Sequence, residues 1–143
     1  METNPILRIP HSVWAEMRAE AGQKAPEEAC GLLAGKGDRI EMHYAIPNEL
    51  HSPTRFRMGA QAQVQAFIDM DRRNLELLAI WHSHPSGPPS PSPTDISEFA
   101  YPGTLYLIWV PIHQDSDGSI RDWGARGFRI EDGLVCETIL KVE

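Results

Sequence analysis

The sequence has few cysteines, no long apolar run and fewer basic than acidic residues, and each shortage excludes a class of protein. Its 143 residues include two cysteines, too few for the disulfide framework of a small secreted domain. The longest apolar run, Leu105 to Val110, is far shorter than the roughly 20 residues of a membrane-spanning helix. Lysine and arginine total 13 against 20 aspartates and glutamates, a net charge of −7. That charge disfavours nucleic acid and anionic membrane surfaces as partners.

The amino-terminal segment and the composition predict an ordinary cytoplasmic globular domain. The segment Met1 to Arg8 lacks the apolar core of a signal peptide, so we expect the protein to stay in the cytoplasm. Apolar residues make up 41% of the chain and charged residues 23%, values typical of a folded globular protein. We find no internal repeat and no linker. We therefore expect one domain over residues 1–143, whose oligomeric state the sequence does not predict.

Helical periodicity predicts two or three helices. Apolar residues recur at helical spacing early in the chain, and Gly22 is placed to end that helix. Those residues are Val13, Met17 and Ala21. A second helix is expected from the sixties to Arg73, closed by Asn74 in the left-handed conformation. A short third helix is expected over Thr94–Ala100.

The remaining apolar segments predict the strands of a mixed β-sheet, so the fold class is α/β with helices flanking the sheet. The segments Leu77–Trp81 and Thr104–Val110 are continuously apolar, which indicates central strands buried on both faces, with Trp81 and Trp109 in the core. Asp132-Gly133 is a two-residue hairpin signal. The other expected strands are Ile6–Ile9, Ala29–Ala34, Arg39–Ile46, Phe128–Ile130 and Leu134–Ile139.

The chemistry is concentrated in the segment that follows the strand ending at Trp81. Alternate residues of a strand face the same side, so His82 and His84 point together while Ser83 points away. Asp95 follows a proline-stiffened loop and stands at the start of a short helix. Two imidazoles and one carboxylate leave a fourth position open to water, which is the pattern of catalytic zinc. We therefore expect one zinc ion per chain, held by His82, His84 and Asp95.

A metal-activated water also needs a base that is not a ligand, and Glu28 is the candidate. Glu28, Cys30 and Leu32 share one face of a predicted strand. A glutamate that opens a buried strand can face a cavity and be held near the water. The alternative is that Glu28 is a solvated carboxylate at the strand end, as we expect for its neighbour Glu27.

The spacing of these residues resembles the JAMM/MPN+ metalloprotease signature of the JAB domain family. Every signature position is filled at the expected spacing: Pro26-x-Glu28-x-x-Gly31, then His82-x-His84, and finally Ser92-Pro-Thr-Asp95. The surrounding segments resemble small prokaryotic members, and the resemblance covers essentially the whole chain. It implies a fold similar to that of cytidine deaminases, a mixed sheet with zinc at the edge of a groove.

The resemblance also implies an activity, a zinc-dependent peptidase or isopeptidase. His82, His84 and Asp95 would bind zinc, Glu28 would act as general base, and Ser92 would help to stabilise the oxyanion. Family members cut after the C-terminal glycines of ubiquitin or ubiquitin-like sulfur carriers. The implied partner is therefore a carrier protein with a Gly-Gly tail. The tail would lie extended in a groove, partly by strand addition.

Several alternatives stay open at this stage. Ser92 and Asp95 also fit a helix N-terminus, with Pro93 at the first helical position. A catalytically silent scaffold that binds a protein partner would keep the fold, and two histidines with a carboxylate also match the iron site of oxygenases. The segment 45–59 is the expected groove wall. The remaining histidines have no partner pattern and are expected at the surface; they are His11, His43, His51 and His113.

Overall fold

The computed structural model describes residues 6–99, 101 and 103–143. Two of the expectations therefore fall partly outside the described residues: the amino-terminal segment up to residue 5, and the end of the third helix at Ala100.

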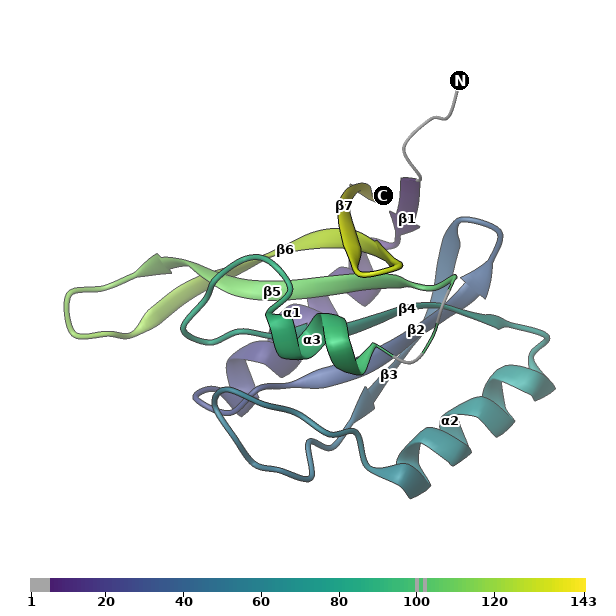
Figure 1. Cartoon of the computed structure of the whole chain (residues 1–143), viewed down its shortest axis with the longest axis horizontal. Coiled ribbons are helices and arrows are strands. Elements are labelled where there is room, and N and C mark those ends of the chain that lie inside the picture. The colour runs from purple at the N-terminus through teal and green to yellow at the C-terminus, as the bar shows by residue number, and fades with distance from the viewer. Residues whose placement is uncertain (1–5, 100, 102) are drawn as a thin grey trace.

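Within the described residues, seven strands form one mixed sheet that closes on itself through its first strand (Figure 1). Their order in the sheet is β1-β3-β2-β4-β5-β6-β7. The strands are β1 (Ile6–Ile9), β2 (Cys30–Lys36), β3 (Arg39–Ile46), β4 (Glu76–Ser83), β5 (Leu105–Gln114), β6 (Ile120–Glu131) and β7 (Leu134–Val142). Strand β4 runs antiparallel to β2 and parallel to β5, so the predicted mixed sheet is confirmed.

Closure of the sheet was not predicted. Strand β1 pairs in parallel with β7 along its length and with β3 through the single pair Arg8 and Arg39. These pairings join segments distant in the sequence, and periodicity within one segment carries no information about them. The turn between β6 and β7 follows the prediction, because Asp132 and Gly133 have φ angles of 51° and 76°.

In the part of the chain that the structure describes, three helices flank the sheet: α1 (His11–Lys24), α2 (Ala60–Arg72) and α3 (Pro93–Glu98). The prediction that Gly22 ends the first helix is wrong. The helix continues to Lys24. Ala25 is not helical (φ −54°, ψ 139°), because the ring of the following Pro26 disfavours the helical conformation for the residue before it. Asn74 follows α2 with φ 55°, as predicted. None of the described helices combines the length and the apolar character needed to cross a bilayer.

The two faces of the sheet carry separate clusters of buried side chains. On one face α1 packs against the sheet, and Trp81 and Trp109 are fully buried there, as predicted. On the other face α2 covers residues that include Leu32 and Ile80. Because successive residues of β4 alternate between these faces, His82 lies on the side of α2 and α3.

One histidine departs from its expected place at the surface. The side chain of His43 is only 4% exposed, because it lies on β3 beneath α1. Its ring packs against Trp81, with 5.5 Å between centroids, and its Nδ1 lies 3.2 Å from the Glu16 carboxylate. A polar residue on the face of a strand gives no sequence signal that a helix will cover it.

Candidate metal centre

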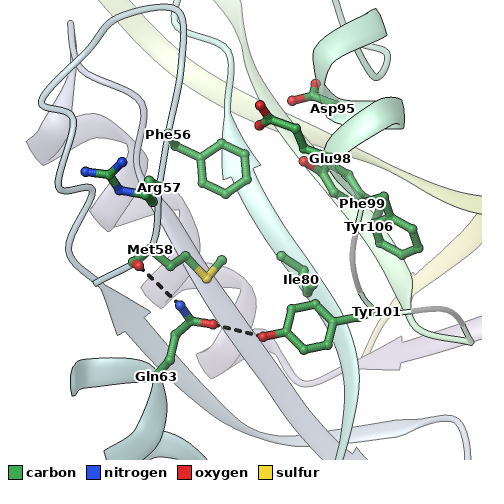
Figure 2. A pocket seen from close by; sticks show the side chains of 10 residues that line it. All are labelled: Phe56, Arg57, Met58, Gln63, Ile80, Asp95, Glu98, Phe99, Tyr101 and Tyr106. Atoms are coloured by element: carbon green, nitrogen blue, oxygen red, sulfur yellow. Dashed lines mark hydrogen bonds between the residues drawn. The ribbon is translucent and has the colours of Figure 1, made fainter. Parts of the chain in front are cut away.

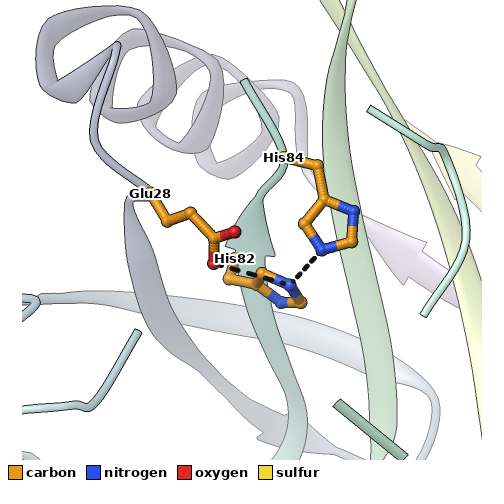
Figure 3. A group of neighbouring side chains, drawn as sticks. All are labelled: Glu28, His82 and His84. Carbon is orange, nitrogen blue, oxygen red and sulfur yellow. Dashed lines mark hydrogen bonds and ion pairs between the residues drawn. The ribbon is translucent and has the colours of Figure 1, made fainter. Parts of the chain in front are cut away.

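The two histidines of the motif converge as the strand alternation predicts. His82 is the penultimate residue of β4, and His84 directly follows the strand. Both are buried, and their Nε2 atoms lie 2.7 Å apart (Figure 3). The Nδ1–H of His84 donates to the Pro88 carbonyl oxygen at 2.7 Å. That bond fixes the tautomer of a neutral His84 and leaves the Nε2 lone pair aimed at His82.

Asp95 brings a carboxylate to the same point from the first turn of α3. Its Oδ2 lies 3.2 Å from His84 Nε2 and 3.4 Å from His82 Nε2. The same Oδ2 accepts a hydrogen bond from the Ser92 backbone N–H at 2.8 Å, and the Asp95 N–H donates to Ser92 Oγ at 3.0 Å. This capping box fixes the direction of the carboxylate. The helix-cap interpretation of Asp95 is therefore compatible with a ligand position.

The donor set fits a small divalent cation. Ligand atoms at tetrahedral zinc lie about 2.0–2.1 Å from the metal and therefore roughly 3.3 Å from one another. The separations among His82 Nε2, His84 Nε2 and Asp95 Oδ2 are 2.7, 3.2 and 3.4 Å. Two imidazole nitrogens and a carboxylate oxygen suit zinc better than calcium or magnesium, which prefer oxygen ligands.

Glu28 lies beside this set but farther from its centre. The residue is 4% exposed, and its Oε1 lies 4.0 Å from His82 Nε2. Glu28, His82 and His84 each offer a ligand atom within 4.8 Å of the others, so they also form a possible metal-binding group. Two carboxylates therefore flank the imidazoles, with Asp95 the closer.

The two carboxyl groups of the site, on Glu28 and Asp95, have pKa values shifted in opposite directions. Burial raises the pKa of Glu28 from 4.5 to about 8. Burial also acts to raise the pKa of Asp95, but the adjacent imidazoles of His82 and His84 outweigh it and hold that pKa well below its usual range. Burial lowers the pKa of His82. Without a metal ion, Glu28 therefore holds a proton near neutral pH while Asp95 stays ionised; a divalent cation between the imidazoles and Asp95 would favour the ionised form of Glu28, which a base needs.

Two polar residues that the sequence analysis did not select hold the backbone around Glu28. Ser83 is fully buried, and its hydroxyl accepts a hydrogen bond from the Ala29 N–H at 2.8 Å. Asn48 donates from Nδ2 to the Glu28 carbonyl oxygen at 3.0 Å. The only sequence signal for Ser83 is its place inside the His-x-His motif, and Asn48 has none, because it lies in an irregular segment.

A cavity of about 300 Å³ opens beside Asp95 (Figure 2). Three lining residues, Phe56, Arg57 and Met58, come from the predicted groove wall. The others are Gln63, Ile80, Asp95, Glu98, Phe99, Tyr101 and Tyr106. The Phe56 ring also stacks on His82, with 4.5 Å between centroids and 21° between planes. The cavity is mostly apolar and aromatic, and it is continuous with the candidate metal centre through Asp95.

Comparison with known proteins decides the family. Residues 10–125 match the model for prokaryotic homologs of the JAB domain. The chain belongs to this family. The match includes all five candidate site residues: Glu28, His82, His84, Ser92 and Asp95.

Several relatives of this JAB-domain protein are proteases by name. A CysO-cysteine peptidase from Mycobacterium tuberculosis is 33% identical over 142 residues, which cover 96% of this chain and 91% of the relative. A probable TtuB-protein conjugate cleaving protease from Thermus thermophilus is 40% identical over 94 residues. That match covers 65% of this chain and 63% of the relative, so it spans less than two thirds of that protein. A desampylase from Pyrococcus furiosus is 36% identical over 81 residues, covering 57% of this chain and 58% of the relative.

Solved structures show the same fold. A protein from Desulfitobacterium hafniense superimposes with a TM-score of 0.81 at 31% identity, covering 96% of this chain and 92% of that one. A JAB1/MPN domain protein from Archaeoglobus fulgidus superimposes with a TM-score of 0.60 at 20% identity, covering 96% and 97%. These neighbours confirm the JAB/MPN fold expected from the sequence.

Proposed function

We propose that this protein is a zinc-dependent peptidase that hydrolyses the bond after the C-terminal glycines of a ubiquitin-like or sulfur-carrier protein. The convergence of His82 Nε2, His84 Nε2 and Asp95 Oδ2 within 3.4 Å, with a buried Glu28 alongside, carries this proposal. A catalytically silent scaffold has no need for a buried carboxyl beside three convergent donors, since burying such groups costs stability.

In the proposed mechanism His82, His84 and Asp95 hold zinc, and Glu28 moves the proton. Zinc at this position supplies Lewis acidity, which lowers the pKa of a water and polarises a carbonyl. Glu28 is farther from His82 Nε2 than Asp95 is, at 4.0 Å against 3.4 Å, which suits a base better than a ligand. Glu28 accepts a proton from the attacking water and delivers it to the leaving nitrogen.

The Ser92 hydroxyl can serve both as a helix cap and as a hydrogen-bond donor to the substrate. Its hydroxyl oxygen accepts the Asp95 N–H, which uses an acceptor position and leaves its own O–H free to donate. In the proposed mechanism that O–H donates to the oxyanion that forms on the scissile carbonyl. Helix capping and oxyanion stabilisation are then complementary, because the cap holds the hydroxyl beside Asp95.

The substrate proposal rests on the cavity and on the relatives. A Gly-Gly sequence is the narrowest segment that a polypeptide offers, so it suits the end of the cavity where Phe56 and Asp95 lie against the buried imidazoles. The apolar lining of the cavity suits a larger side chain upstream of the glycines. The names of the relatives, a CysO-cysteine peptidase and a TtuB-protein conjugate cleaving protease, support a carrier protein as substrate.

The test is cleavage of a carrier protein whose Gly-Gly tail is fused through a peptide bond to a reporter. We expect the zinc-loaded protein to release the reporter and a chelator to stop the reaction. Glu28→Gln should lower kcat by at least about 10²-fold, because general-base catalysis typically contributes 10²–10⁴-fold. Glu27→Gln is the matched control: this neighbouring side chain is 39% exposed and pairs with His51, so its substitution should leave kcat within about twofold. A Glu28→Gln variant as active as the wild type would exclude the proposed mechanism.

A further inference from the structure

The backbone of Glu28 is held by a loop that also forms the cavity wall. The Glu28 N–H donates to the Ser52 carbonyl oxygen at 2.8 Å, and the Glu28 carbonyl oxygen accepts from Asn48 Nδ2 at 3.0 Å. Strand β2 begins only at Cys30, so Glu28 lies before the ladder that could otherwise fix it. Its backbone polar groups therefore depend on the segment 48–58 (hereafter the wall loop) rather than on the sheet.

Asn48 organises this wall loop with every hydrogen-bonding position of its side-chain amide. Its Nδ2 also donates to the Arg55 carbonyl oxygen at 3.0 Å, and its Oδ1 accepts from the N–H groups of Leu50 and Arg57 at 3.1 and 3.0 Å. An asparagine amide has two donors and two acceptor positions, so the set is complete. Asn48 is 8% exposed, and a buried polar group of this kind costs stability unless it is fully paired.

The same wall loop reaches the metal centre and the cavity. Phe56 stacks on His82 and lines the cavity together with Arg57 and Met58. The base of the loop is closed by an isolated bridge between Asn48 and Met58. One side chain thus joins the backbone of the proposed base to the wall against which a substrate tail would lie.

We propose that Asn48 is a positioning residue, which fixes Glu28 to the wall loop so that tail binding and base placement form one rigid unit. Asn48 has no free donor or acceptor position for a substrate, because its amide is fully used by backbone partners. Its effect passes through the position of Glu28, and a misplacement of about 1 Å at a reacting group can cost about 10²-fold in rate. This inference rests on the proposed function.

The substitution Asn48→Asp separates the two halves of the amide. It keeps the oxygen that accepts from Leu50 and Arg57 and removes the donors to Glu28 and Arg55. We expect kcat for the Gly-Gly fusion to fall at least about tenfold, with KM and zinc content within about twofold of the wild type. Asn74→Asp makes the same change at an exposed turn and is the matched control, expected to leave both constants unchanged.

Amide hydrogen exchange tests the link between the Glu28 backbone and the wall loop without a substrate. In the wild type the Glu28 N–H should become exchangeable together with the Arg57 N–H as the urea concentration is raised, because the first is bonded to Ser52 of the wall loop and the second to Asn48, which also bonds the Glu28 carbonyl oxygen. This measurement needs no variant, so it holds even if Asn48→Asp does not fold. If the wild type cleaves no Gly-Gly fusion, the proposed function fails while the exchange result still decides whether the wall loop holds the backbone of Glu28.

Two results would overturn the inference. One is an Asn48→Asp variant in which KM rises while kcat is kept, since Asn48 would then shape only the cavity wall. The other is a Glu28 N–H that opens with strand β2 while the Arg57 N–H opens independently at lower urea.

Discussion

The Phe56 ring lies flat against the imidazole of His82, with 4.5 Å between centroids and 21° between planes. Phe56 comes from the wall loop and His82 from the centre of the sheet, so this contact joins the two parts of the proposed active site. The ring covers a face of a fully buried imidazole and helps to keep water from it. In a dry site the electrostatic interactions among the donors are stronger.

Replacing Phe56 should loosen the metal centre and the cavity together. We expect Phe56→Ala to speed loss of zinc to a chelator by about tenfold and to raise KM for a Gly-Gly fusion, because it removes both the stacked ring and a cavity wall. Phe56→Tyr keeps the ring and is the control, expected within about twofold of the wild type. Chelator competition followed by a zinc indicator measures the first effect. Equal zinc loss from Phe56→Ala and wild type would show that the ring does not protect the centre.

The stability of the zinc-free protein should fall as pH rises through the range where Glu28 ionises. Burial raises the pKa of Glu28 from 4.5 to about 8, so its contribution is fully present below about 4.5 and is lost as pH rises to about 8. The side chain in Glu28→Gln cannot ionise, so the stability of that variant should not show this pH dependence. Between pH 5 and pH 8.5 we expect wild type to lose on the order of 2–4 kcal/mol relative to Glu28→Gln, as measured by urea unfolding in chelator. Parallel curves for the two proteins would contradict the raised pKa.

The two roles of Ser92 can be separated by substitution. Asparagine is also a good N-cap residue, so Ser92→Asn should keep the stability of α3 while removing the hydroxyl donor. Ser92→Ala should lose both, at a cost of about 1 kcal/mol in the free energy of unfolding. We expect kcat to fall about 10²-fold or more in each variant if the hydroxyl stabilises the oxyanion. Full activity in Ser92→Asn would leave Ser92 with the capping role alone.

Packing explains why a glycine stands at position 31 of the signature, without any role for it in the chemistry. A Cβ at Gly31 would lie 2.6 Å from the Tyr44 carbonyl oxygen and closer still to the Trp81 indole nitrogen. We expect Gly31→Ala to lower the free energy of unfolding by about 3 kcal/mol or more, measured by chemical denaturation. Gly22→Ala is the contrasting control, because its Cβ would meet Trp123 at an ordinary 3.6 Å inside helix α1. That change should stabilise the protein by up to about 1 kcal/mol.

The sequence predicted the parts of the site that depend on local geometry. The alternation of a strand was enough to bring His82 and His84 to one face, and a helix-start pattern was enough to fix Asp95. Both predictions concern residues separated by a regular backbone or by a short stiff loop. The prediction of a hairpin turn at Asp132-Gly133 was confirmed for the same reason, because the positive φ angles of the turn depend on these two residues.

The parts that the sequence did not predict depend on contacts between distant segments. Segment 45–59 was expected as a groove wall, and Phe56 of this segment does line the cavity. The segment has no hydrophobic period, however, so the contacts of Asn48 with Glu28 and of Phe56 with His82 were not predicted. The burial of His43 depends on a helix that crosses strand β3. Periodicity predicts which residues share a face, but not which element will cover that face.

The zinc content of the purified protein is the most direct test of the account. The comparison needs wild type, Asp95→Asn and Ser92→Ala, each loaded with zinc, washed and measured by elemental analysis. Asparagine can still accept the Ser92 N–H, so Asp95→Asn removes the ligand charge while keeping the helix cap. We predict about one zinc per chain in wild type and Ser92→Ala and a large loss in Asp95→Asn. A wild type that binds no zinc, or an Asp95→Asn variant that binds it as tightly, would contradict the proposed metal centre.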